Sequence, residues 1–195
     1  MAKSSRGTRT VTPTSASSPA AGSSGGVTQG AGKLIAAVQS GKYDKLSYAE
    51  QDELYNDAAY ESKALNVKPA EERYNAEQMK ALAVYHSSLY DDINSDLRRG
   101  GNGGQYAKTL DGMFDYTLKK PVVVYRGTEK APARGADKAF QSTSLSAAKA
   151  QYFTHGSKHL HAYKLPAGTK VIYLGGSEEE IILPRGFNLA KHKIK

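Results

Sequence analysis

The sequence has no cysteine, no tryptophan and no long run of apolar residues. Without cysteine the chain forms neither disulfides nor thiolate metal sites, and a reducing compartment suits it. Because no stretch approaches the roughly 20 apolar residues of a membrane-spanning helix, we expect no membrane span. The chain does have 13 tyrosines, whose rings add core area and whose hydroxyl groups suit contacts with ligands.

Length and charge narrow the class of protein further. The 195 residues are 39% hydrophobic, which is enough for one domain with its own core. The net charge of +8 favours partners that are acidic or that carry nucleic acid.

The first 32 residues differ in composition from the rest. Serine, threonine, glycine, alanine and proline dominate residues 1–32, and the charged side chains there are Lys3, Arg6 and Arg9. Such a segment buries too little apolar surface to offset the entropy lost on ordering, so we expect a flexible basic tail. A translocation signal of a bacterial effector is the alternative. Residues 33–195 are then expected to form a single domain.

The apolar spacing in residues 33–120 indicates helices. Ser47 and Asn75 are each followed three residues later by Glu or Gln, which is the capping-box pattern of a helix start. Apolar residues three or four apart predict one helix over residues 79–97, ended by two arginines and a glycine. A further amphipathic helix is predicted over residues 105–118.

After Pro121 the pattern changes to short β-branched and apolar runs bounded by turn residues. We predict a brief helix at 147–153, a closing segment at 187–194, and strands at 121–126, 140–144, 159–165, 170–174 and 179–183. Helices first and strands afterwards predict the α+β class, with an amino-terminal helical lobe (33–120) packed on a mostly antiparallel β core (121–195).

Three consecutive carboxylates, Glu178, Glu179 and Glu180, lie between a Gly-Gly-Ser turn and an apolar Ile-Ile-Leu run. Strand alternation predicts that Glu178 and Glu180 share one face and that Glu179 points to the other. Two carboxylates on one face repel each other, which costs stability unless they act on something. A solvated acidic turn is the alternative for the three glutamates taken alone.

Arg126 ends a predicted apolar strand, where its guanidinium needs either an internal carboxylate or a phosphate as partner. Ser142 and Ser144 share one face of another strand, although such hydroxyls are often satisfied by the backbone. The arginine, the hydroxyls and the paired carboxylates lie on different strands, and we expect them to converge on one cleft.

These segments together resemble a known family. Tyr125–Gly127, Phe140–Ser144 and Glu178–Leu183 resemble, in order, the Arg, Ser-Thr-Ser and Glu-x-Glu signature of mono-ADP-ribosyltransferases. Tyr90–Arg98 resembles the family's helix motif, in which a tyrosine and an asparagine face the nucleotide, and Lys164–Thr169 resembles its Pro-x-Gly turn. The pattern is most similar to that of the bacteriophage and bacterial arginine-directed enzymes.

The resemblance implies a helical lobe on a two-sheet β core, with NAD as the substrate and no metal. It implies that Arg126 holds the NAD phosphates with its planar guanidinium. It makes Glu180 the carboxylate that stabilises the oxocarbenium-like centre formed as nicotinamide leaves. Glu178 is implied as the base that takes a proton from the attacking arginine.

Five further residues gain roles from the same resemblance. Ser142 would orient the catalytic glutamate, and Gly127 would offer backbone groups to the nicotinamide amide. Phe153 would pack against nicotinamide, with a core residue of the short helix as its alternative role. Tyr90 and Asn94 lie one helical turn apart, so both are expected to reach the nucleotide.

We therefore expect transfer of ADP-ribose from NAD to arginine side chains of host proteins, among which the basic surface points to transcription or translation machinery. NAD hydrolysis and modification of nucleic acid in the same cleft are alternatives. A basic nucleic-acid-binding protein with an inactive cleft is an alternative of another class. We expect a monomer in the cytoplasm of a bacterial host, if this is a bacteriophage protein, or a secreted effector in a host cytosol.

Overall fold

The computed structural model describes residues 26–60, 65–68, 70–87 and 89–195, without the side chains of Tyr60 and Glu178. The expectation for the tail lies outside the described residues as far as residue 25. The first helix, α1 (Gln29–Gln39), already begins before residue 33. Among the described helices, none combines the length and the apolar character that crossing a membrane requires.

The strands of the described chain form one connected antiparallel sheet in the order β1-β5-β6-β3-β2-β4. The strands are β1 (Tyr116–Thr117), β2 (Val122–Thr128), β3 (Gln141–Ser144), β4 (His159–Leu165), β5 (Lys170–Gly175) and β6 (Glu180–Leu183). The predicted α+β class, with amino-terminal helices and a mostly antiparallel sheet, is confirmed.

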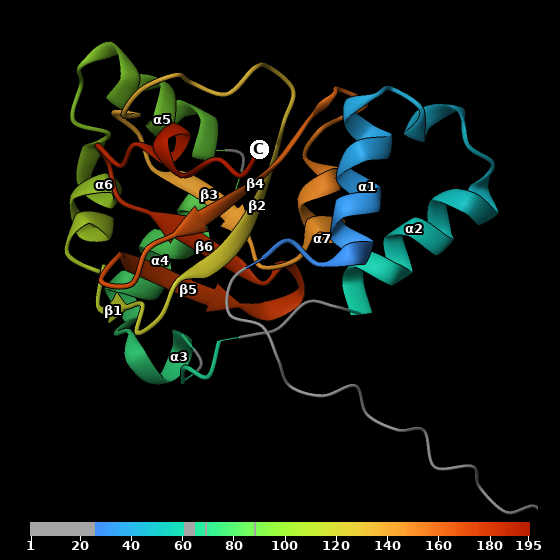
Figure 1. Cartoon of the computed structure of the whole chain (residues 1–195). Coiled ribbons are helices and arrows are strands. Elements are labelled where there is room, and N and C mark those ends of the chain that lie inside the picture. Colours follow the sequence, from blue (N-terminus) through green and yellow to red (C-terminus); the bar gives the residue numbers. More distant parts are fainter. Residues whose placement is uncertain (1–25, 61–64, 69, 88) are drawn as a thin grey trace, which may run out of the picture.

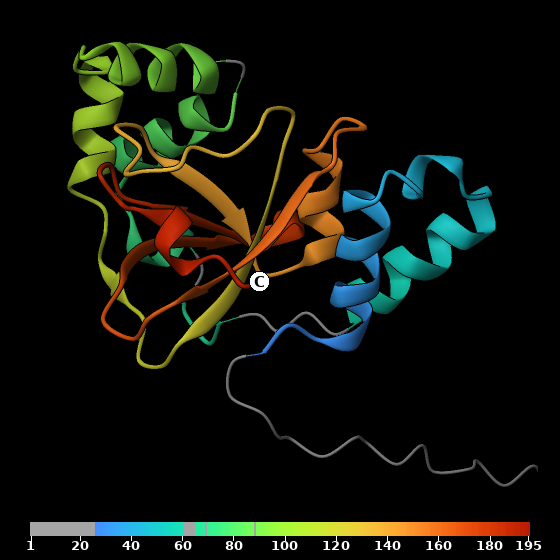
Figure 2. The ribbon, with the colours of Figure 1, turned by 45° about the horizontal axis from the view of Figure 1, so that its top comes forward.

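The helices gather in two groups at opposite ends of the sheet order (Figures 1 and 2). One group packs near β2 and β4 and consists of α1, α2 (Tyr48–Tyr60) and α7 (Ala147–Tyr152). The other packs on β5 and β6 and consists of α3 (Ala70–Arg73), α4 (Ala76–Tyr85), α5 (Leu89–Arg99) and α6 (Gly104–Asp111). Three short 3₁₀ helices complete the described elements: η1 (Tyr43–Lys45), η2 (Gly176–Glu178) and η3 (Leu189–His192).

Local sequence explains where two of the helices begin. The side chain of Glu50 accepts a hydrogen bond from the Ser47 amide at 2.8 Å, and the Ser47 hydroxyl accepts one from the Glu50 amide at 3.4 Å. Asn75 and Gln78 make the same reciprocal pair at 3.0 Å each. Both predicted capping boxes are confirmed, and each satisfies amides that a helix start leaves unpaired.

The single helix predicted over residues 79–97 is wrong, because α4 ends at Tyr85 and α5 begins at Leu89. The Ser87 hydroxyl donates to the Val84 carbonyl at 2.6 Å and accepts from the Leu89 amide at 3.2 Å. A serine side chain that replaces backbone partners in this way ends a helix locally. The apolar spacing continues across the break because both helices face the same core.

Two further predictions are corrected by tertiary pairing. The helix expected over residues 105–118 ends at Asp111, and Tyr116 and Thr117 instead pair with β5 as strand β1. The closing segment at 187–194 is no strand. It contains η3, after which Lys193 bridges Tyr163 and the Ile194 amide donates to the Ala162 carbonyl at 2.9 Å.

One core packs both halves of the sheet together, β2 and β4 in one half and β5 and β6 in the other. Val124 of β2 and Tyr163 of β4 pack in one cluster with Val171 of β5 and Ile181 of β6. In the described chain, β2 and β3 share the single register pair Tyr125–Ser144. The two halves therefore share one core and are joined at a single register pair, so the predicted two-sheet core is corrected to one connected six-stranded sheet.

Candidate active site

A cavity of about 940 Å³ opens where β2 and β3 separate beyond the pair Tyr125–Ser144. Residues 126–130 line one side of it, and Gln141–Ser144 line another. The ends of α4, α5 and α7 and the start of β6 complete the wall. Groups from both helix groups and both halves of the sheet therefore meet in one cavity.

Arg126 spans the gap between the two separating strands. Its Nη1 donates to the Ser142 carbonyl at 2.5 Å, and its side chain remains half-buried in the cavity wall. One such bond leaves several of the five guanidinium N–H donors for other partners. The predicted phosphate-binding arginine thus lies in the cavity with donors available to an anion.

Glu180 is the first residue of β6 and is only 6% exposed, although it lines the cavity. Its Oε2 lies 2.5 Å from Nε2 of His86, the residue that follows α4. A helix carboxyl terminus favours a cation at the position of His86. The contact therefore pairs the carboxylate with an imidazolium when His86 is protonated.

The hydroxyl of Ser142 faces helix α4 instead of bonding to Glu180. Ser142 lies opposite Ile182 in the strand register, whereas Ser144 lies opposite Glu180. The Ser142 hydroxyl is 3.5 Å from the hydroxyl of Tyr85. The prediction that Ser142 holds the glutamate directly is thus corrected: Ser142 lines the cavity, but its side chain connects to Tyr85.

Tyr85 and Asn94 continue this connection into the protein. The Asn94 amide donates to the Tyr85 hydroxyl at 3.2 Å, and its carbonyl accepts from the Phe140 amide at 3.2 Å. Burial, followed by the neighbouring Tyr90, raises the pKa of Tyr85, so its hydroxyl stays neutral. Asn94 is fully buried behind the wall, which corrects its predicted direct contact with a nucleotide.

Tyr90, unlike Asn94, does line the cavity, where its ring packs edge-on against Tyr85 with centroids 5.2 Å apart. Phe153 ends α7 and lines the same cavity while remaining 47% exposed. An aromatic ring that is half open to solvent beside a cavity suits stacking on a ligand. Its alternative role as a core residue is not what the structure shows.

Gly127 lines the cavity and also contacts α7 closely. A Cβ at this position would lie 2.0 Å from the Ala150 carbonyl oxygen, so only glycine allows α7 to approach β2 this closely. The sequence pattern predicts a ligand contact at Gly127. The structure shows that the close packing of α7 on β2 by itself requires glycine at this position.

The acidic segment before β6 turns more sharply than a strand. Glu178 ends η2, and Glu179 has a left-handed backbone with φ of 50°, as do Gly175 and Gly176 with φ of 66° and 65°. The alternation predicted for Glu178 and Glu180 is wrong, because only Glu180 belongs to the strand. The backbone places Glu178 on the turn two residues before Glu180.

Comparison with known proteins adds the family context. No protein-family model matches the sequence, and no match is found among curated proteins. Among solved structures, exoenzyme S from Pseudomonas aeruginosa, in complex with human 14-3-3 protein beta and bound to carba-NAD, matches with a TM-score of 0.50 and 20% identity. The match covers 79% of this chain and 78% of that one. The chain has an ADP-ribosyltransferase-like fold.

Two other solved structures match with lower TM-scores. Plx2a, an ADP-ribosyltransferase toxin from Paenibacillus larvae, has a TM-score of 0.48 and 20% identity, over 60% of this chain and 76% of that one. The eukaryotic mono-ADP-ribosyltransferase ART2.2 has a TM-score of 0.43 and 21% identity, over 80% of this chain and 74% of that one.

Within this ADP-ribosyltransferase-like fold, sequence reasoning missed two groups at the cavity. His86 follows a helix with no motif around it, and only its contact with Glu180 reveals it. Arg98 forms a two-point pair with Asp137 at 3.0 and 3.1 Å, and both residues line the cavity. Burial alone would raise the pKa of Asp137, but its bonds to Arg98 and the Ala139 amide lower that pKa.

The donor set gives no indication of a metal centre. In the part of the chain that the structure describes, no three His, Asp or Glu side chains are grouped closely enough to hold a metal ion. Chemistry at this cavity is therefore derived from the carboxylate, guanidinium, imidazole and aromatic groups described above.

Proposed function

We propose that this protein transfers ADP-ribose from NAD to an arginine side chain of an acceptor protein and releases nicotinamide. The observation that carries the proposal is the nearly buried carboxylate of Glu180 in a cavity that also holds the guanidinium of Arg126. A carboxylate in that position is costly unless it stabilises a developing positive charge. The likeness to exoenzyme S, which was solved with carba-NAD, supports NAD as the substrate.

Glu180 acts on the sugar carbon that bears nicotinamide. The glycosidic carbon–nitrogen bond breaks and its electron pair neutralises the positively charged nicotinamide nitrogen. The carbon left behind resembles an oxocarbenium ion, which a nearby carboxylate stabilises. An arginine nitrogen of the acceptor then bonds to this carbon and loses a proton. No redox partner is needed for this exchange.

The residues around Glu180 suit the pyrophosphate and the nicotinamide of NAD. Arg126 offers its remaining donors to the pyrophosphate, which matches the planar fork of a guanidinium. The half-exposed ring of Phe153 stacks on nicotinamide, and Gly127 lines the cavity and lets α7, which carries Phe153 at its end, pack closely on β2. Tyr90 contributes the cavity wall on the side of α5.

Glu178 accepts the proton of the acceptor arginine in this proposal. A protonated guanidinium is a poor nucleophile, so a carboxylate beside the attacking nitrogen is required. The backbone of Glu178 lies on a turn two residues before Glu180, which lines the cavity. We propose a host protein as the acceptor and a monomeric enzyme, acting in a bacterial cytoplasm or in a host cytosol.

His86 is proposed as the residue that positions the Glu180 carboxylate, a role first assigned to Ser142. Its ring nitrogen lies 2.5 Å from the carboxylate. The Asn94–Tyr85–Ser142 connection fixes the end of α4 against β3 and so places His86.

The experiment that tests the proposal follows radiolabel from adenylate-labelled NAD into a bacterial lysate treated with the protein. Glu180→Gln serves as control because the amide keeps the shape of the carboxylate and removes its charge. We expect label on discrete protein bands with the wild type and at least a hundredfold less with the variant. Mass spectrometry of the labelled bands would show whether an arginine side chain is the acceptor.

The outcomes separate the alternatives. Label that nuclease releases places the acceptor on nucleic acid, and nicotinamide release without label makes the protein an NAD glycohydrolase. If neither label nor nicotinamide appears with a folded wild-type protein, the proposed function is wrong. The urea unfolding midpoint of Glu180→Gln is measured alongside, so that lost activity is not mistaken for lost structure.

A further inference from the structure

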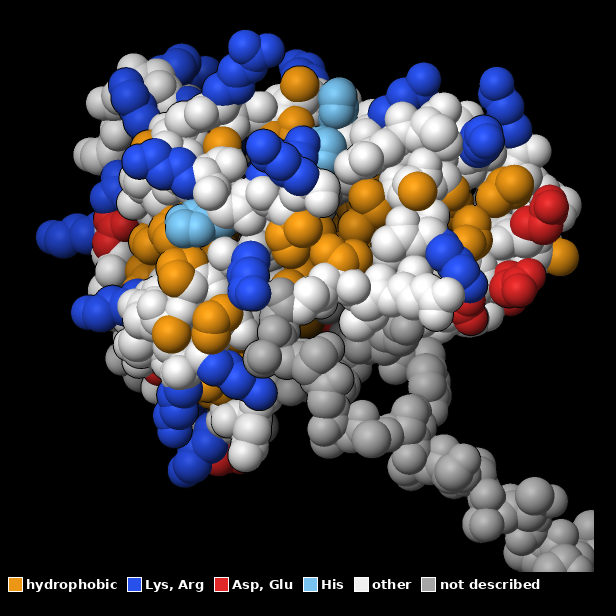
Figure 3. All heavy atoms as spheres, viewed as in Figure 1, with side chains coloured by type: hydrophobic (Ala, Val, Ile, Leu, Met, Phe, Trp, Pro, Cys, Tyr) orange, Lys and Arg blue, Asp and Glu red, His pale blue; other side chains and the backbone are white. Residues whose placement is uncertain are grey.

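The net positive charge of the protein comes from its carboxyl-terminal part. Residues 116–195 contain 14 Lys and Arg against five Asp and Glu, while the whole chain has 27 against 19. Residues 1–115 thus contain 13 against 14 and are close to neutral. On the face shown in Figure 3, acidic side chains lie mainly at the right, whereas basic ones are spread over the whole face.

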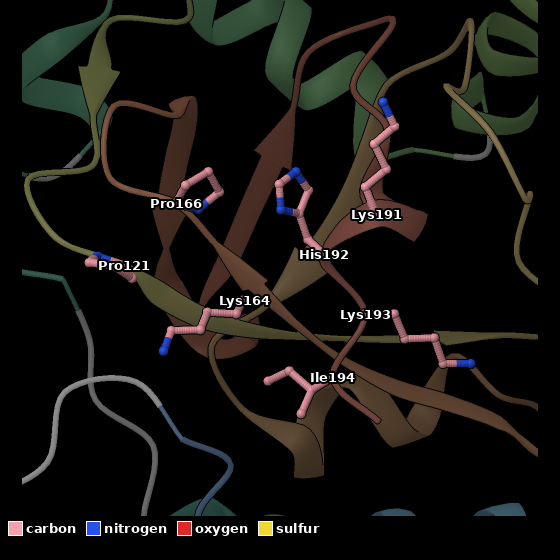
Figure 4. A pocket seen from close by; sticks show the side chains of 7 residues that line it. All are labelled: Pro121, Lys164, Pro166, Lys191, His192, Lys193 and Ile194. Carbon is pink, nitrogen blue, oxygen red and sulfur yellow. The ribbon is translucent and has the colours of Figure 1, made fainter.

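A shallow hollow lies within this basic part, beside the edge strand β4. It has a volume of about 430 Å³ and is lined by Pro121, Lys164, Pro166, Lys191, His192, Lys193 and Ile194. Figure 4 shows the three lysines on different sides of the hollow, with His192 between them. The lining therefore combines three cations with small apolar surfaces and contains no acidic residue.

The lysines of the hollow have no counter-charge within the described protein. None of Lys164, Lys191 and Lys193 forms an ion pair with a described Asp or Glu, and all three are exposed. Lys119 and Lys120, also exposed, directly precede Pro121 at the rim. Unpaired cations close together repel one another, so an anionic partner lowers their energy.

The hollow adjoins the active-site cavity through a shared wall. Within η3, Leu189 and Ala190 line the cavity, while Lys191 and His192 line the hollow. Tyr163 and Lys164 are divided in the same way on β4. A macromolecule held in the hollow would therefore lie next to the place where the proposed chemistry occurs.

We propose that this hollow binds the phosphate backbone of a single-stranded nucleic acid. Residues 116–195 hold 14 cations, 11 of them lysines. Lysine and arginine side chains that neutralise successive phosphates release the counterions of a nucleic acid, which favours binding. The proline and isoleucine surfaces give sugars and bases an apolar contact. If the proposed function holds, on which this last point rests, the surface holds an acceptor protein through the nucleic acid that is bound to it.

The test is fluorescence anisotropy with a fluorescein-labelled single-stranded RNA of about 20 nucleotides, measured from 50 to 200 mM salt. The full-length protein is compared with a triple variant, Lys164→Gln, Lys191→Gln and Lys193→Gln. A matched control carries Lys45→Gln, Lys80→Gln and Lys108→Gln, which are exposed lysines of the near-neutral part. A polyglutamate peptide of equal charge is the competing anion.

We expect the hollow variant to bind RNA about tenfold more weakly at 100 mM salt, and its log–log salt slope to be smaller by about 2. The control variant should change affinity less than twofold. Equal weakening in both variants, absence of RNA binding by the wild type, or a preference for polyglutamate would each overturn the proposal.

NAD turnover measured on the same preparations keeps this inference apart from the proposed function. None of the substituted lysines lines the active-site cavity, so turnover should be equal in all three proteins. RNA binding without any NAD turnover would leave the nucleic-acid surface standing and reject the transferase. NAD turnover without RNA binding would reject the nucleic-acid surface and leave the transferase standing.

Discussion

The half-exposed imidazole of His86 lies 2.5 Å from the nearly buried carboxylate of Glu180 in the cavity. Removing a carboxylate from water costs free energy that a hydrogen-bonded or charged partner must offset. When protonated, His86 supplies a positive charge from the end of α4, while the β-sheet fixes the backbone of Glu180. The pair therefore controls both the direction and the charge of the group that we propose as catalytic.

His86→Gln should lower kcat for nicotinamide release about tenfold and change KM for NAD less than threefold. Glutamine still reaches the carboxylate as a donor but carries no charge, so substrate binding is retained while the carboxylate is held less firmly. Steady-state kinetics of nicotinamide release give both constants. His159→Gln, a change on β4 outside the cavity, is the control. An unchanged kcat in His86→Gln would show that His86 does not position Glu180.

At the scale of elements, strand β2 and helix α7 lie this close together only because residue 127 is glycine. Gly127→Ala places a Cβ 2.0 Å from a backbone oxygen of α7, and backbone cannot swing away as a side chain can. We expect the free energy of unfolding to fall by about 2–3 kcal/mol, as for other overpacked sites. Urea denaturation measures it. Gly135→Ala is the matched control because nothing lies within 4 Å of its added Cβ, and it should shift stability by less than about 0.5 kcal/mol.

Helix α1 and strand β4 are joined by a contact that depends on pH. Gln39 Nε2 donates to the Leu160 carbonyl at 2.8 Å and lies 3.0 Å from His161 Nδ1, which therefore accepts and must be unprotonated. Burial, followed by the charges of Lys193 and His159, lowers the pKa of His161 to about 4.

An unfolded histidine has a pKa of about 6.5, so between pH 6.5 and 4 the unfolded chain binds the extra proton. Stability should therefore fall as the pH decreases through this range, with His161 accounting for about 2 kcal/mol of the loss. Urea midpoints at pH 7 and pH 4.5 for the wild type and His161→Gln measure this share. If both proteins lose the same free energy on acidification, His161 does not cause the loss.

The sequence predicted most of these elements but not the contacts between them. Strand runs such as 159–165 and caps such as Ser47 are specified by neighbouring residues, so local pattern sufficed. β1 forms only because β5 lies beside it, and the break after Tyr85 depends on one serine hydroxyl. The contact of His86 with Glu180 joins residues 94 positions apart, and no local spacing reveals such a pair.

For the whole molecule, the position of the cavity matters more than any one of its groups. The two helix groups pack on different cores, and the halves of the sheet meet at one register pair. Tyr90 and Arg98 reach the cavity from one side, and Arg126 and Phe153 reach it from the other. A ligand in this cavity therefore connects two parts of the protein, the group of α1, α2 and α7 and the group of α3 to α6.

A non-hydrolysable NAD analogue should therefore stabilise both parts at once. At a concentration 100 times its Kd, mass action raises the free energy of unfolding by about 2.7 kcal/mol, which a shift of the urea midpoint measures. Hydrogen exchange should slow for backbone amides of both α5 and α7, because the nucleotide bridges the elements that carry Tyr90 and Phe153. Nicotinamide alone, which lacks the phosphates, should protect α7 and leave α5 unchanged. Protection by the analogue in only one helix group would contradict a binding site that spans the junction, since a ligand stabilises only the parts whose opening breaks its contacts.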